Sequence, residues 1–166
     1  MSDFEINGIA QIGILVRSID VAIEQFAKLF GIDEWNINHV DTAREDGGRF
    51  QSGGQDVSVK AKIAWVTLGA VELELIEPED TTSVYAQFLE THGPGIHHLM
   101  FDTDDYQQTL NCLRDDGVEE MLSGELQKTR FQMFDTRPTL GLLSEFAVGD
   151  ALVPDEIRKI DREGQR

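Results

Sequence analysis

The sequence contains a single cysteine, Cys112, in 166 residues. Disulfide frameworks, cysteine-based zinc sites and iron–sulfur clusters each need several cysteines, so all three are excluded. Basic residues are also scarce, because 14 Lys and Arg oppose 31 Asp and Glu and give a formal net charge of −17. Proteins that bind nucleic acids or anionic membranes present clusters of Lys and Arg. We therefore expect neither kind of partner.

Long hydrophobic runs are missing as well. The longest, Ile9 to Val16, includes Gln11 and spans eight residues, whereas a membrane-spanning helix needs about twenty. Residues 1–5 are acidic where a secretion signal is basic and then apolar. We therefore expect a soluble, cytoplasmic protein. With 40% hydrophobic residues, the chain has enough apolar side chains for the core of one ordinary domain over residues 1–166.

The first half of the chain alternates between strand and helix patterns. Apolar residues first alternate, as in a strand, and then recur at helical spacing after Ser18 or Asp20, either of which can cap a helix. Two further apolar segments follow, and the turn Gly69-Ala70 between them predicts a hairpin. Residues 36–56 are polar and rich in glycine, which predicts a long, mobile loop. The predicted elements are a strand at 8–16, a helix at 18–30, and strands at 57–68 and 71–76.

The second half repeats this order after a short predicted helix at 83–90. Its predicted elements are a strand at 96–102, a helix at 104–116 that starts at Asp104, and a hairpin of strands at 131–134 and 141–148. We interpret the two halves, about 8–78 and 95–148, as two βαβββ modules. They predict an α+β fold with one cup-shaped mixed sheet, helices on its convex side, and a polar tail at 149–166.

Four strands carry polar residues on the face opposite the one that packs on a helix. These residues are Gln11, Glu74, His98 and Glu145. Because a buried carboxylate is costly unless it is paired or bound to a cation, four such donors in one cup fit a divalent-metal site. The alternative is that each lies on a solvated strand face, and any one of them taken alone favours this second interpretation.

Several segments resemble the methylmalonyl-CoA epimerases. Gly93–Asp105, which contains His97-His98, and Val71–Pro78 are similar to the corresponding segments of these enzymes, and Ile9–Val16 and Gly141–Phe146 resemble their first and last strands. The chain is thus identified as a member of the vicinal oxygen chelate superfamily, which also includes glyoxalase I, fosfomycin-resistance proteins and extradiol dioxygenases. The resemblance implies the paired βαβββ fold in a single domain.

The resemblance also implies a divalent metal ion bound by Gln11, Glu74, His98 and Glu145. The epimerases have a histidine at the position of Gln11, whereas glyoxalase I of the human type has a Gln, Glu, His, Glu set in this order. Zinc, cobalt, nickel, manganese and magnesium all suit one imidazole with several oxygens. Glu145 is the first candidate for the catalytic base and Glu74 the second. Some epimerases use a further glutamate, which the matching stretch Ile63–Trp65 lacks.

These features predict a metal-dependent isomerase or lyase, resembling methylmalonyl-CoA epimerase and glyoxalase I, that moves a proton next to a carbonyl through a metal-bound enolate. An oxygenase and a small-molecule-binding or resistance protein of the same fold are the alternatives. The expected partners are a small carbonyl compound, with an acyl-CoA or a thiol adduct among the candidates, and a second copy of the chain in a homodimer. The basic residues that could meet coenzyme A phosphates are Arg44, Arg49, Lys60, Lys62, Lys128, Arg130 and Arg137, although scattered surface charge is the simpler interpretation.

Overall fold

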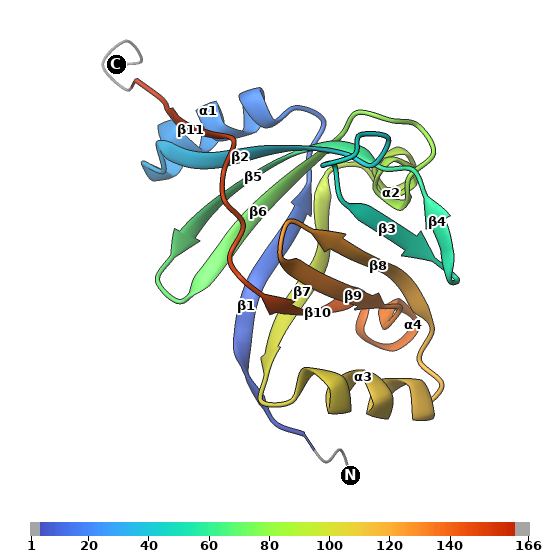
Figure 1. Ribbon diagram of the computed structural model, residues 1–166. Coiled ribbons are helices and arrows are strands. Elements are labelled where there is room, and N and C mark those ends of the chain that lie inside the picture. Colours follow the sequence, from blue (N-terminus) through green and yellow to red (C-terminus); the bar gives the residue numbers. More distant parts are fainter. Residues whose placement is uncertain (1–3, 162–166) are drawn as a thin grey trace.

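The computed structural model describes residues 4–161, and its two halves share the order of a strand, a helix and three strands, with an additional hairpin of two short strands at 49–57 in the first half (Figure 1). The elements are β1 (Ile6–Leu15), α1 (Ile19–Phe30), β2 (Glu34–Asp41), β3 (Arg49–Ser52), β4 (Gln55–Val57), β5 (Lys60–Leu68), β6 (Val71–Pro78), α2 (Val84–His92), β7 (Gly95–Thr103), α3 (Tyr106–Asp115), β8 (Glu120–Leu126), β9 (Thr129–Phe134), α4 (Arg137–Leu140), β10 (Leu143–Gly149) and β11 (Glu156–Lys159).

Within residues 4–161 the strands form one mixed sheet of eleven strands in the order β11-β2-β5-β6-β1-β7-β10-β9-β8-β3-β4. Strands β1 and β7 pair antiparallel at its centre, and each also pairs parallel with a strand of its own half, β6 and β10 respectively. The sheet curls into a half-barrel (Figure 1). The predicted α+β fold with two βαβββ modules around one curved sheet is confirmed.

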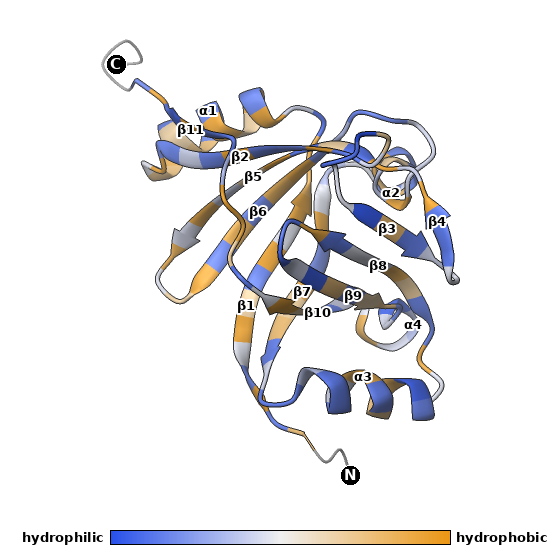
Figure 2. Ribbon diagram, viewed as in Figure 1, coloured by the Kyte–Doolittle hydropathy of each residue, from blue (hydrophilic) through white to orange (hydrophobic). Residues whose placement is uncertain are grey.

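Helices α1 and α3 pack on the outer face of the sheet, as alternation predicts. Beneath α1, Ile19 and Ile23 join Leu75 of β6 in one buried cluster, and beneath α3, Leu110 joins Phe146 of β10 in another. Hydrophobic and hydrophilic residues alternate along β1 and β6 (Figure 2). One set of side chains therefore faces a helix and the other set faces the inside of the cup. No helix within residues 4–161 is long and apolar enough to cross a membrane.

The helix ends explain one small error of the prediction. Ser18 caps α1, as expected, and Gly31 follows it with a φ of 73°, a left-handed conformation that glycine adopts without strain. The third helix, however, begins at Tyr106, two residues after the predicted start at Asp104, because Asp105 is its cap and the Asp105 side chain accepts a hydrogen bond from the Gln108 amide at 3.0 Å. The Asp104 carboxylate instead accepts from the Glu5 amide at 2.9 Å.

The predicted mobile loop at 36–56 is wrong, because this segment contains three strands. Strand β2 pairs with β5, and β3 and β4 form a hairpin that extends the sheet from β8. Phe50 is buried in this hairpin. Asn38 is buried on β2 because its side-chain oxygen accepts a hydrogen bond from the Asp155 amide at 2.6 Å. Polar residues that look solvated in the sequence are therefore satisfied by the tail, whose strand β11 pairs with β2.

Candidate functional site

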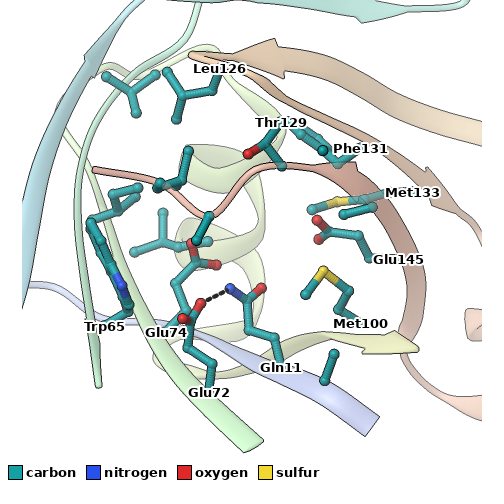
Figure 3. A pocket seen from close by; sticks show the side chains of 18 of the residues that line it. Gln11, Trp65, Glu72, Glu74, Met100, Leu126, Thr129, Phe131, Met133 and Glu145 are labelled. Carbon is teal, nitrogen blue, oxygen red and sulfur yellow. Dashed lines mark hydrogen bonds between the residues drawn. The ribbon is translucent and has the colours of Figure 1, made fainter. Parts of the chain in front are cut away.

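The inner face of the sheet encloses a cavity of about 360 Å³. Both halves of the sheet contribute to its wall, and Figure 3 shows Gln11, Glu72 and Glu74 on one side of it and Met100, Met133 and Glu145 on the other. Most of the remaining lining is apolar, and it includes Val40, Phe50, Ile63, Trp65, Leu126, Phe131 and Leu152. This is the size and character of a small-molecule site, in which a few polar groups are placed within an apolar enclosure.

The four predicted site residues come together at the floor of the cup, where Gln11, Glu74 and Glu145 line the cavity and the buried His98 lies directly behind them. The imidazole Nε2 of His98 lies 3.1 Å from Gln11 Oε1, 3.1 Å from Glu145 Oε2 and 3.6 Å from Glu74 Oε2. His98 is fully buried, and the other three side chains are nearly so. Each half of the chain therefore supplies two of the four groups.

The register of the central strands produces this convergence. On β1, Gly13 lies opposite Glu74 of β6 and opposite His98 of β7. A Cβ atom at position 13 would overlap the imidazole ring of His98. The absence of a side chain at Gly13 is therefore what leaves space for the ring at the floor of the cup.

Glu72 is a site residue that the sequence interpretation did not assign. Its Oε1 accepts a hydrogen bond from Gln11 Nε2 at 2.7 Å. Because the amide nitrogen is engaged there, the Gln11 oxygen faces His98. Alternation with Leu73 places Glu72 on the same cup face as Glu74, but this pattern alone does not reveal its hydrogen bond to Gln11.

Burial sets the protonation of the floor. It raises the pKa of Glu74 to about 8, with the nearby Glu72 adding to the effect, and it raises the pKa of Glu145 well above its ordinary value. Burial also lowers the pKa of His98 to about 3, with His97 adding to the effect. Burial thus disfavours the charged form of both His98 and Glu145, whose Nε2 and Oε2 atoms lie 3.1 Å apart. A neutral imidazole is the form that binds a metal ion.

A sequence model of the glyoxalase/bleomycin resistance protein/dioxygenase superfamily matches residues 10–133, well over half of the chain. The chain belongs to this superfamily. The resemblance to vicinal oxygen chelate proteins is confirmed by this match and by the structural neighbours.

Curated relatives match different lengths of the chain. The uncharacterized protein YqjC of Bacillus subtilis is 31% identical over 113 residues, which cover 68% of this chain and 69% of that protein. The 4-hydroxyphenylpyruvate dioxygenase of Pseudomonas aeruginosa is 37% identical over 70 residues, which cover 42% of this chain. Those 70 residues are 19% of the dioxygenase, so the chain matches about a fifth of that enzyme's length.

Solved structures of superfamily members share the fold. Methylmalonyl-CoA epimerase from Mycobacterium tuberculosis has a TM-score of 0.64 and 22% identity, covering 91% of this chain and 93% of the epimerase. A methylmalonyl-CoA epimerase in complex with methylmalonyl-CoA and NH4+ has a TM-score of 0.61 and 22% identity, covering 90% of this chain and 99% of that one. At 22% identity, this similarity establishes that the chain shares the fold of these enzymes.

The floor residues of this superfamily member suit a divalent cation. One imidazole nitrogen is grouped with amide and carboxylate oxygens, a donor set that several divalent metals accept. Glu145 Oε2 is buried without a hydrogen-bond partner, and no Lys, Arg or His side chain lines the cavity to offset the carboxylates. In the part of the chain that the structure describes, no three His, Cys, Asp or Glu side chains are arranged so that they could hold a metal ion as they stand. The donors would therefore have to close in around an ion.

His97 supports His98 from behind. The Nδ1 atoms of the two rings lie 3.2 Å apart, and the His97 ring packs against Tyr85 and Phe88 of α2 with centroid distances of 5.3 and 5.0 Å. When His98 presents the Nε2 lone pair to a cation, its hydrogen sits on Nδ1, so His97 Nδ1 must accept it. The His97 hydrogen then lies on Nε2, a buried atom with no hydrogen-bond partner.

Proposed function

We propose that this protein is a divalent-metal-dependent isomerase or lyase that moves a proton on a carbon next to a carbonyl. Gln11, Glu74, His98 and Glu145 would hold the ion. The observation that carries this proposal is the convergence of these donors on one point beneath an apolar cavity. A bound ion would act as a Lewis acid, accepting a carbonyl oxygen and making the neighbouring C–H more acidic.

The side chains have separate roles in this proposal. His98 is neutral and contributes a nitrogen, and Gln11 contributes an oxygen that Glu72 aims toward the centre. With a cation beside it, the carboxylate form of Glu145 is favoured, and its Oε2, which has no hydrogen-bond partner inside the cup, would then take the proton from the substrate carbon. If Glu145 returns the proton to the neighbouring carbon, the reaction is an isomerisation. If Glu74, which belongs to the other half of the chain, returns it to the opposite face of the same carbon, the reaction is an epimerisation.

Metal analysis combined with deuterium exchange tests this function. Purified protein is analysed for bound metals and incubated in D2O with α-chiral acyl-CoAs, 2-oxoaldehyde–thiol adducts and α-hydroxyketones. We expect about one divalent ion per chain and deuterium uptake at the carbon next to the carbonyl of at least one class. Protein that binds no divalent ion from a zinc, cobalt, nickel, manganese and magnesium series would contradict the proposal.

Two variants separate binding of the ion from proton transfer. Glu145→Gln keeps a neutral oxygen donor, so it should retain metal while deuterium exchange falls about 100-fold or more, the usual scale of a lost general base. His98→Ala removes the only nitrogen donor of the four and should lose the metal. If Glu145→Gln exchanges deuterium at the wild-type rate, Glu145 is a ligand only and Glu74 is the base.

An oxygenase is the second candidate, and the local similarity to 4-hydroxyphenylpyruvate dioxygenase favours it. Non-haem iron oxygenases use two histidines and one carboxylate, whereas the floor has one histidine aimed inward and Gln11 in another donor position. Iron content and oxygen uptake distinguish the two functions. Stoichiometric iron with substrate-dependent oxygen consumption would establish the oxygenase and overturn the isomerase.

A further inference from the structure

We propose that the substrate is a compact, uncharged carbonyl compound that carries an aromatic or branched aliphatic group. Its carbonyl oxygen faces the floor and the apolar group fills the cavity. This inference rests on the proposed function and narrows its substrate class, and it excludes coenzyme A thioesters. Three independent properties of the cavity support it: the chemistry of its wall, the sign of its charge and the segment that crosses it.

The wall above the floor is apolar on both sides. Phe50 and Phe131 pack against each other with ring centroids 5.3 Å apart, and Trp65 stands on the opposite half of the sheet. Apart from the floor residues, the polar lining is limited to Tyr85, Thr129 and Asp150. An apolar substituent gains by displacing water from such a wall, whereas a polar chain loses hydrogen bonds that the wall cannot replace.

Above the floor, the cavity has no positively charged group for an anion. Asp150 is the charged residue of this part of the lining, and no basic side chain is among the lining residues. Most of the basic residues that the sequence offered for coenzyme A phosphates form ion pairs with acidic residues, and only the pair of Lys128 includes a residue of the cavity lining. Those ion pairs are Arg44–Asp46, Arg49–Asp56, Lys60–Glu79, Lys62–Asp20, Lys128–Asp150 and Arg137–Asp135. A phosphate or carboxylate held above the floor therefore finds no basic side chain among the lining residues.

A segment that we call the strap, residues 150–155, closes one side of the cavity. It runs from β10 in one half of the sheet to β11 beside β2 in the other half (Figure 1). The Val153 backbone exchanges two hydrogen bonds with the Gln127 side chain, at 2.8 and 2.9 Å, and the Asp155 amide donates to Asn38. Leu152 of the strap lines the cavity and packs on the central core. The wall is thus tied at both ends, which favours a compact occupant.

Hydroxamic acids test this substrate class, because their two adjacent oxygens chelate a divalent ion. Acetohydroxamate, benzohydroxamate and 4-carboxybenzohydroxamate are titrated into zinc-loaded protein by calorimetry, with isobutyryl-CoA as the anionic comparison. We expect benzohydroxamate to bind at least tenfold more tightly than acetohydroxamate. The added carboxylate should remove that gain, and isobutyryl-CoA should bind more weakly than benzohydroxamate. Equal affinity for the first two, or tighter binding of the carboxylated compound or of the CoA thioester, would overturn the proposal.

A matched pair of variants assigns the preference to the wall. Phe131→Ala removes a ring from the cavity, and Phe101→Ala removes a half-buried ring from the outer face beside Phe146. Phe131→Ala should weaken benzohydroxamate about tenfold and leave acetohydroxamate unchanged, whereas Phe101→Ala should change neither affinity. Loss of the benzohydroxamate preference in the Phe101→Ala variant, with none in Phe131→Ala, would contradict the assignment.

An experiment on metal-free protein tests the substrate class independently of the proposed function. Acetophenone and benzoate are titrated into protein treated with a chelator. We expect acetophenone to bind more tightly than benzoate by at least tenfold, whether or not the protein binds metal. Tighter binding of benzoate would refute the substrate class even if metal binding and deuterium exchange are found. If acetophenone is preferred but no metal binds, the substrate class stands and the proposed function fails.

Discussion

Gly13 has a larger effect on the site than its lack of a side chain suggests. It lies between Glu74 and His98 in the register of the central strands, and the His98 ring occupies the space where a Cβ would be. The position of the proposed metal-binding nitrogen therefore depends on a residue that bears no functional group. Interiors are packed closely enough that even one methyl group here must displace the ring or the strand.

A substitution at this glycine should consequently damage both stability and the site. We expect Gly13→Ala to lower the free energy of unfolding by about 1–3 kcal/mol, the usual cost of overpacking, and to weaken metal binding. Urea unfolding and metal titration measure the two effects. Gly8→Ala on the same strand is the matched control, since nothing lies within 4 Å of a Cβ at that position. Similar effects at both positions would mean that strand propensity, not the His98 ring, is responsible.

The raised pKa of Glu74 makes the stability of the metal-free protein depend on pH. Because burial raises this pKa from 4.5 to about 8, the folded chain binds a proton that the unfolded chain has released. The stability from this group is fully present below about pH 4.5 and is lost as pH rises through about 8. We expect the melting temperature of chelator-treated protein to fall between pH 6 and 8.5, and less steeply in Glu74→Gln. Glu90→Gln, on an exposed position of α2, should keep the wild-type slope, and an unchanged slope in Glu74→Gln would contradict the assignment.

At the scale of elements, the way a segment is buried decides whether its sequence reveals it as a strand. Strands β1, β6, β7 and β10 have one face on a helix or the core and one in the cup, so a period of two shows both their existence and their inward residues, among them Gln11 and Glu145. Strands β2, β3 and β11 instead form their hydrogen bonds with segments far away in the sequence. Asn38, for example, is satisfied by the backbone of Asp155, and no local pattern contains that contact.

The same reasoning explains which parts of the candidate site were predicted. Alternation identifies side chains on the cup face, but it does not reveal which of them bond to each other. The hydrogen bond from Gln11 to Glu72 and the contact between His97 and His98 both depend on register across strands or on ring orientation. His97 in particular faces away from the cup and reaches the site only through its neighbour.

Helix α2 supports β7 through His97, and this support can be tested. His97→Phe should preserve the packing with Tyr85 and Phe88 while removing the acceptor for His98 Nδ1. We expect metal affinity to fall about 10- to 100-fold, as for other partners of metal-bound histidines, with little change in melting temperature. His97→Gln, which restores a hydrogen-bonding group, should recover part of the affinity. Full affinity in His97→Phe would mean that His97 has only a packing role.

The whole molecule carries a formal charge of −17 and exposes several large apolar side chains, including Leu29 and Phe30 at the end of α1. A homodimer stays a prediction. We expect light scattering at micromolar concentration to give twice the chain mass of 18.6 kDa, because association would cover exposed apolar surface. A mass equal to one chain at that concentration would refute it.

The floor of the cup joins the two halves of the chain. Gln11 and Glu74 come from the first half, and His98 and Glu145 come from the second. An ion held by all four binds only when the halves are docked, so its binding free energy adds to the stability of the complete sheet. At an ion concentration of a hundred times Kd, the added stability is about 2.7 kcal/mol.

Metal should therefore raise the melting temperature of the whole chain in a single transition and slow proteolysis throughout it. Differential scanning calorimetry with and without zinc measures the shift, and His98→Ala, which lacks the central donor, should show none. Stabilisation confined to one half, seen as two separate transitions or as protease protection of residues from one half only, would show that the ion is held by a subset of the four donors. The division between protected and unprotected segments would then identify which half retains the ion.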